Sequence, residues 1–107
     1  MTHKEQIEQL LSPLECKVCQ DYLDTKNIPK EYVIYSIGLT HNRHYADGKV
    51  FLKQPYCRID CFSDGIANYT LGDQVENLID ELNAHRINVG YLEDIKRTQV
   101  TFEFYLI

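Results

Sequence analysis

The four cysteines are the residues whose types and spacing come closest to a metal-binding or reactive site. Two residues separate Cys16 from Cys19, and three separate Cys57 from Cys61. Two pairs of thiolates could hold a zinc ion, and a Cys-x-x-Cys pair alone could act as a redox centre. No βαβ pattern of the thioredoxin kind accompanies the first pair. Both interpretations therefore depend on the elements that carry the cysteines.

The second cysteine pair falls in residues 56–62, where apolar and polar residues alternate as in a β-strand. Cys57, Ile59 and Cys61 then share one face. Cys57 and Cys61 would lie about 13 Å apart along the strand, at ~3.3 Å per residue, which is too far for one zinc ion or a disulfide. We predict that both are small buried core residues, while a redox role for Cys16 and Cys19 stays open.

Other catalytic patterns are weak or missing in the sequence. His41 and His44 have the spacing of some metal ligands, but they lie in a polar stretch without a third ligand nearby. The chain has no Gly-x-Ser-x-Gly, no phosphate-binding glycine loop and no His-Glu-x-x-His. We therefore expect no enzymatic activity, no catalytic residues, no cofactor and no metal.

Two oppositely charged segments are candidates for contacts with partners. Residues 41–53 are locally positive, and the predicted helix over residues 71–84 has an acidic face. One interpretation is a solvated hairpin whose lysines protect a sheet edge. The other is a contact between the positive segment and the acidic helix of a neighbouring copy, as in a head-to-tail ring. The candidate contact residues are Arg43, His44, Tyr45, Lys49, Lys53, Asp73, Glu76 and Asp80.

The first half of the chain predicts one helix followed by strands. Thr2 and Glu5 have capping-box spacing before a helix over residues 2–11, which Pro13 ends. Residues 16–23 are compatible with a short strand or a loop. Residues 24–30 form a connection, and residues 32–39 are rich in the β-branched and aromatic types that favour strands.

The second half predicts a hairpin, a helix and two strands. Asp47-Gly48 is a turn signal, from which a long strand over residues 49–62 returns, interrupted by Pro55 at an edge or bulge. A loop follows from residue 63, and Thr70 caps a helix over residues 71–84. The last strands cover residues 87–92 and 98–107.

This order indicates an α+β fold: a mainly antiparallel sheet of four to five strands with two helices packed on one face. A length of 107 residues suits a single domain over residues 1–107. The residues that we expect to meet between sheet and helices are Val33, Tyr35, Ile59, Val89, Phe102 and Phe104 with Leu10, Leu11, Val75, Leu78 and Leu82.

Composition narrows the classes of partner and compartment. Lys and Arg number 11 against 16 Asp and Glu, a net charge of −5, which disfavours general nucleic-acid binding. No apolar run approaches the ~18 residues of a membrane span, and the polar N-terminus lacks the apolar core of a signal peptide. We expect a cytoplasmic chain with reduced cysteines.

The residues also resemble a known family. The run Tyr45-Ala-Asp-Gly-Lys-Val-Phe-Leu-Lys, then Tyr56-x-Arg-Ile-Asp, an amphipathic helix and a final Val-Thr-Phe-Glu-Phe-Tyr-Leu-Ile, is similar to small tail-terminator or head–tail joining proteins of long-tailed bacteriophages and prophages. The resemblance covers nearly the whole chain in element order and local pattern. It departs from the family in lacking a Trp after the helix, and in Cys57 and Cys61 at positions expected to be aliphatic.

The resemblance implies a structural protein that forms a ring, often a hexamer, on the last disc of tail-tube subunits. The ring would stop polymerisation and present a surface to the head connector, without bond chemistry. Its partners would be its own copies, the tail-tube protein and head–tail connector proteins, but no membrane and no specific nucleic-acid sequence. It would pass from the host cytoplasm during assembly to the head–tail junction of the virion. The alternatives are another neck connector, or a small cytoplasmic protein-binding module unrelated to virions.

Overall fold

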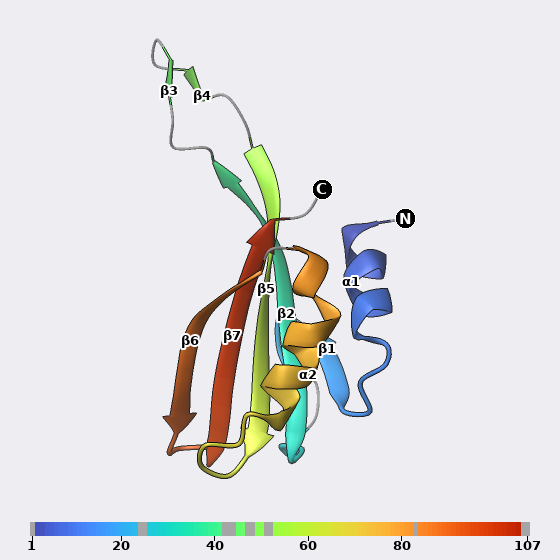
Figure 1. Cartoon of the computed structure of the whole chain (residues 1–107), viewed down its shortest axis with the longest axis vertical. Helices are drawn as coiled ribbons and strands as arrows, with labels where there is room; N and C mark the ends of the chain where they lie inside the picture. Colours follow the sequence, from blue (N-terminus) through green and yellow to red (C-terminus); the bar gives the residue numbers. More distant parts are fainter. Residues whose placement is uncertain are drawn as a thin grey trace.

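The structure is a computed structural model that describes residues 2–23, 26–41, 45–46, 49–50, 53–82 and 84–105. Strands dominate it, and two short helices lie against one sheet (Figure 1). In chain order the elements are α1 (His3–Leu11), β1 (Lys17–Gln20), β2 (Glu31–His41), β3 (Tyr45–Ala46), β4 (Lys49–Val50), β5 (Lys53–Asp64), α2 (Thr70–Leu78), the 3-10 turn η1 (Asp80–Leu82), β6 (His85–Leu92) and β7 (Arg97–Tyr105).

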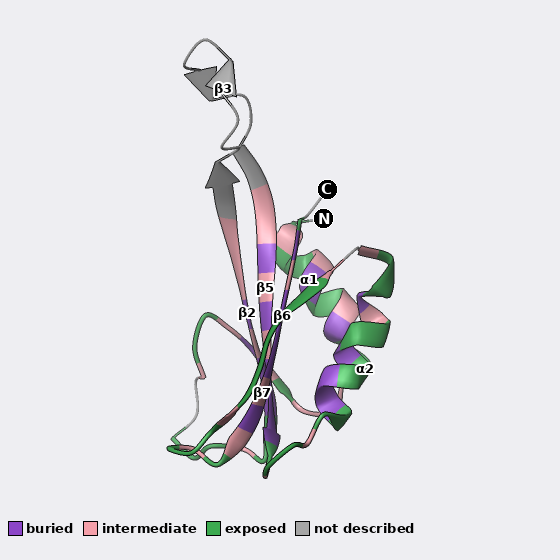
Figure 2. Ribbon diagram, turned by 60° about the vertical axis from the view of Figure 1, so that its left-hand side comes forward, coloured by how far each residue is buried: buried purple, intermediate pink, exposed green. Residues whose placement is uncertain are grey.

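The main sheet has five strands in the order β1-β2-β5-β7-β6. Neighbouring strands run antiparallel except β1, which pairs in parallel with β2. Both helices cover the same face of the sheet (Figure 2). The predicted α+β fold is therefore confirmed, and residues 16–23 do contain a short strand. β3 and β4 form a separate antiparallel pair.

The core lies between the helices and the face of the sheet that they cover. Alternate residues of β2, β5 and β7 point to this face, because side chains alternate along a strand. Each fully buried aliphatic side chain contributes about 1.5–3 kcal/mol. The buried cluster comprises Ile7, Leu11, Val33, Tyr35, Cys57, Ile59, Cys61, Leu71, Val75, Ile79, Val100, Phe102 and Phe104, with Leu10, Leu78 and Leu82 packed against it half-buried.

One predicted core residue is wrong. Val89 of β6 is 43% exposed, although it lies opposite buried Val100 of β7. β6 is the last strand of the sheet, beyond the part that α2 covers, and its register shifts between Arg86 and Asn88. Alternation in the sequence does not reveal that a strand lies at an edge, where neither face is fully buried.

Helix α1 begins as the sequence predicts. The Thr2 hydroxyl accepts a hydrogen bond from the Glu5 backbone N–H at 3.1 Å and donates to Glu5 Oε1, also at 3.1 Å. Thr2 thus satisfies one of the backbone donors that a helix start leaves unpaired. The helix ends at Leu11. Ser12 still has helical backbone angles, but Pro13 has no N–H with which to continue the helical hydrogen bonds.

Helix α2 differs from its prediction at both ends. It starts at Thr70, so Thr70 is not its N-cap; Tyr69 holds that position without a side-chain bond. Asn68 Oδ1 accepts instead from the Thr70 N–H at 3.3 Å, while the Asn68 N–H donates to Thr98 Oγ1 at 3.2 Å. The α-helix ends at Leu78, and η1 replaces the predicted last turn. The tighter winding of η1 keeps Leu82 against the core before β6 begins.

The central strand β5 ends two residues later than predicted and is more regular. Pro55 lies inside β5 opposite Leu39, and the register with β2 is unbroken from Lys53 to Ser63. β5 therefore continues through Pro55 without a bulge, and the predicted loop begins at residue 65 instead of residue 63. A proline needs only a strand position whose missing N–H is not required, and the described β5–β7 pairing starts after it, at Tyr56.

The predicted turn Asp47-Gly48 lies outside the described residues, as do the last two residues of the chain. The strands on either side of this dipeptide pair as a hairpin requires. Tyr45 lies opposite Val50, and Ala46 opposite Lys49.

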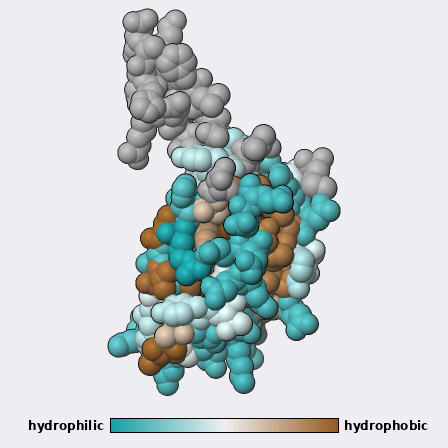
Figure 3. Space-filling model, in the orientation of Figure 1, coloured by the Kyte–Doolittle hydropathy of each residue, from teal (hydrophilic) through white to brown (hydrophobic). Residues whose placement is uncertain are grey.

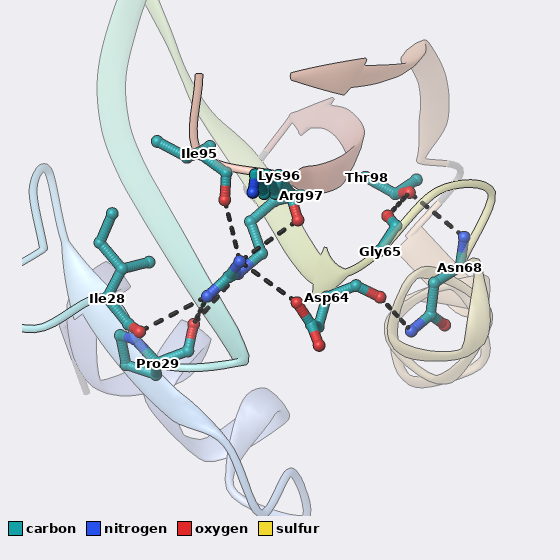
Figure 4. Close-up of polar contacts among 9 residues, drawn as sticks. All are labelled: Ile28, Pro29, Asp64, Gly65, Asn68, Ile95, Lys96, Arg97 and Thr98. Atoms are coloured by element: carbon teal, nitrogen blue, oxygen red, sulfur yellow. Dashed lines mark hydrogen bonds and ion pairs between the residues drawn. The ribbon is translucent and has the colours of Figure 1, made fainter. Parts of the chain in front are cut away.

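Arg97 binds three separate segments of the chain at the end of the sheet where β7 begins (Figure 4). Its guanidinium donates to the Pro29 carbonyl at 2.8 and 3.2 Å and to the Ile95 carbonyl at 2.9 Å, and lies 3.3 Å from Asp64. The first bond holds the connection from β1 to β2, which lies on the face opposite the helices (Figure 2). On that face Tyr32 and Phe62 stack at 4.6 Å and are buried.

Candidate functional site

The acidic face of α2 is the part of the predicted contact surface that the structure describes most fully. Asp73 and Glu76 lie on α2, one turn apart, and Asp80 begins η1. All three residues are exposed. Their spacing follows from the helical repeat, which places positions three and four apart side by side.

Arg86 of β6 occupies this acidic face within the same chain. Its Nε donates to Glu76 Oε2 at 3.0 Å, and its Nη2 lies 3.4 Å from Asp73 Oδ1. Its guanidinium also lies over the Phe102 ring, 5.4 Å from the centroid. Partial burial acts to lower the pKa of Arg86, but the hydrogen bonds and charges of Glu76 and Asp73 raise it above its ordinary value.

Two of the three predicted acidic contacts are therefore already paired. Arg86 links the start of the edge strand to α2 and offsets one of the two negative charges of Asp73 and Glu76. Within the described part of the chain, Asp80 has no ion pair. A hollow of about 290 Å³ separates the end of α2 from β6, and its lining residues are Glu76, Ile79, Asp80, Ala84, His85 and Arg86.

The positive half of the predicted surface is described only in part. Arg43 and His44 lie outside the described residues. Tyr45, Lys49 and Lys53 fall on β3, β4 and β5, and only their backbone pairing is described. The structure brings Asp73 and Glu76 together around Arg86.

The strands that lead toward the positive segment form a two-stranded arm, which we define as the β2–β5 pairing beyond Tyr56. The last described β5–β7 pair is Tyr56 with Tyr105, whereas β2 and β5 stay paired to His41 and Lys53 (Figure 1). Gly38 lies at the base of the arm, opposite Tyr56. A Cβ at Gly38 would lie 3.0 Å from the Tyr56 ring, so glycine allows the ring to lie across the strand.

The cysteines of β5 are core residues, as predicted. Cys57 and Cys61 are buried on the helix-covered face, and all four cysteines are free thiols. Burial raises the pKa of Cys57 to about 12, and burial is also the main reason that the pKa of Cys61 is raised. Half-buried Cys16 has a raised pKa for the same reason. A thiol that stays protonated is a poor nucleophile and a poor metal ligand.

The described residues include no group of three or more His, Cys, Asp or Glu side chains arranged to hold a metal ion. Neither helix in the described part of the chain is long and apolar enough to cross a membrane. Neither a scan against protein-family models nor a search of curated protein sequences finds a match to this chain.

Arg86 is the residue of this surface that sequence reasoning missed. A signal for it existed, because Asp73 and Glu76 repeat at helical spacing and such a pair attracts a cation. The sequence did not indicate which cation. The partner lies ten residues beyond Glu76, on a strand whose position beside α2 follows only from the fold.

Proposed function

We propose that this chain is a non-enzymatic structural protein of a long-tailed phage or prophage. It forms an oligomeric ring that terminates the tail tube or joins the tail to the head. The observation that carries the proposal is the two-stranded arm between β2 and β5, within the element order of the family that the sequence resembles. A paired arm that continues past the rest of the sheet suits contact with a neighbouring subunit, because its backbone is held by its own ladder.

The chemistry of the β5 thiols and of the acidic face of α2 supports a role in assembly. The thiols of β5 are protonated core residues, and the acidic residues of α2 are paired with Arg86. Contacts of this kind stabilise the domain and do not activate a nucleophile or a base.

Within the ring, the positive segment near the hairpin contacts the acidic residues of α2 and η1 on the next copy. Asp80 is the best candidate on that side, because Arg86 does not compensate it. Asp80→Lys should weaken ring assembly, and adding Arg43→Glu and Lys49→Glu should restore part of it. Equal assembly of wild type and Asp80→Lys, measured by sedimentation in the presence of tail tubes, contradicts this contact.

Deletion of the gene from the phage or prophage that carries it, followed by electron microscopy of the particles, tests the function itself. We expect overlong tails, or filled heads lying apart from tails, and rescue by the wild-type gene supplied in trans. Overlong tails identify tail termination, and separated heads and tails identify joining. Normal infective particles overturn the proposal and favour a protein-binding module unrelated to virions.

A further inference from the structure

Strand β6 is an open edge of the main sheet. It pairs with β7 on one side and is the last strand in the sheet order of the described residues. Ile87 is 48% exposed, Val89 43% and Leu92 36%. Figure 3 shows apolar side chains along the side of the molecule where β6 lies in Figure 1. Such an edge offers unpaired backbone N–H and C=O groups to another strand.

The usual protections of an edge strand cover only the start of β6. Arg86 brings a charge, and the bulge that follows it disturbs the ladder between Arg86 and Asn88. From Asn88 to Leu92 the pairing with β7 is regular, and this segment contains neither a charged residue nor a proline. Residues 88–92 are therefore competent to pair on their free side.

Gly90 is the middle residue of this regular segment. A Cβ built on Gly90 would meet no atom within 4 Å, so the face of the sheet to which residue 90 points is open there. In an antiparallel pairing centred on Gly90, Val89 of each copy would lie opposite Tyr91 of the other. A β-branched residue opposite an aromatic one is a favourable cross-strand pair. Asn88 would lie opposite Leu92 on the other face.

The charges at the two ends of β6 fit the same arrangement. His85 and Arg86 stand at its start, and Glu93 and Asp94 follow its end. Antiparallel pairing about Gly90 brings the basic start of β6 in each copy toward the acidic turn that follows β6 in the other. A parallel pairing in register would place the like charges side by side, at a cost. The edge is thus complementary to itself in one direction, as an isologous contact requires.

We propose that β6 pairs antiparallel about Gly90 with β6 of a second copy, which joins the two sheets into one with all helices on the same face. This inference concerns the chain in solution and does not rest on the proposed virion function. The surface that it assigns is distinct from the two-stranded arm.

Gly90→Lys and Gly90→Glu test the proposal, because they place like charges opposite each other at the two-fold axis. The open space around Gly90 means that neither side chain clashes within its own chain. Ile66→Lys is the matched control, since residue 66 is 75% exposed in the loop between β5 and α2 and gains the same charge. Circular dichroism checks that each variant is folded.

Sedimentation equilibrium from about 10 μM to 1 mM should show wild type and Ile66→Lys rising from the monomer mass of 12.6 kDa toward twice that value. Each Gly90 variant alone should weaken the association at least tenfold. An equimolar mixture of Gly90→Lys and Gly90→Glu should restore it, because opposite charges then meet. A monomeric wild type overturns the proposal and leaves this edge to a strand of another protein. Undiminished association of Gly90→Lys, or no recovery in the mixture, also overturns it.

Discussion

Arg97→Met should destabilise the domain more than any other single replacement of a charged residue in the described part of the chain. The Arg97 side chain is only 12% exposed and donates to the Pro29 carbonyl at 2.8 Å and the Ile95 carbonyl at 2.9 Å. Methionine keeps much of the apolar stem but removes every donor. A hydrogen bond from a charged group contributes about 1.5–3 kcal/mol. The ion pair with half-exposed Asp64 adds less than about 1 kcal/mol.

Two carbonyl acceptors without donors, partly compensated by water, should together cost about 3 kcal/mol. Such a loss is a large fraction of the ~5–15 kcal/mol of a typical domain. Urea unfolding followed by circular dichroism measures it. With a slope of about 1.5 kcal/mol per M, the midpoint should fall by about 2 M. Amide hydrogen exchange should show the largest loss of protection in residues 26–30, whose connection Arg97 holds.

Arg58→Met is the matched control for Arg97→Met. Arg58 has a side chain that is 43% exposed and bonds to Asp60 at 3.3 Å. Asp60 keeps its hydrogen bonds from Gln99 and Thr101 when Arg58 is replaced, and half-exposed Arg58 is expected to contribute less than about 1 kcal/mol. The reasoning is refuted if Arg97→Met loses less than about 1 kcal/mol, or no more than Arg58→Met.

Two further predictions concern the core. Burial raises the pKa of Cys57 to about 12 and also raises that of Cys61. The folded state therefore holds these thiol protons more tightly than the unfolded chain does. The full free energy of unfolding is present below the unfolded thiol pKa of about 8.5, and above that pH it should fall by about 1.4 kcal/mol per thiol per pH unit. Urea titrations between pH 8 and 10 should show a smaller slope in Cys57→Val, which removes one of the three thiols whose pKa is raised, and a flat wild-type profile would contradict it. Gly72→Ala should destabilise by about 1 kcal/mol despite better helix propensity, because its Cβ would lie 3.0 Å from Val100 Cγ2. Greater urea stability of Gly72→Ala would show that the helix and sheet separate freely.

Much of the fold could be predicted because the central strands keep strict alternation. Ile59 and Phe102 were placed in the core from their period of two, and both are fully buried. The Thr2 cap was predicted from spacing alone, because its hydrogen bond is local. Predictions of this kind depend on neighbours within a few residues.

The errors arise where a residue's environment depends on the order of strands in the sheet. Val89 has the alternation of a core strand, but β6 lies at an edge. The parallel pairing of β1 with β2 rests on contacts that four residues of sequence do not specify. Pro55 was expected to break β5, yet β2 pairs with the strand on both sides of it. A proline disturbs only the ladder that requires its N–H.

The location of the candidate site could be predicted from the sequence, but its net charge could not. Asp73 and Glu76 do lie exposed on one face of α2, as the helical repeat indicated. Arg86 offsets part of their negative charge, and it lies on β6, whose position beside α2 the sequence does not reveal. Charge counting along the chain overestimates what this face offers to a partner, because it cannot subtract pairs that form in the folded state.

The two contact surfaces that we propose are largely main-chain features. The arm and the edge of β6 both present strand backbone, and the ladders that they can form depend little on side-chain identity. Because strand pairing needs no particular residue motif, the sequence can have a role in assembly, as we propose, without containing such a motif. Selectivity must then come from features that fix register and direction. On β6 these are the bulge after Arg86, the missing side chain at Gly90 and the opposite charges at the two ends. A variant that alters one of these features should change which strand binds to the edge, while the domain itself still folds.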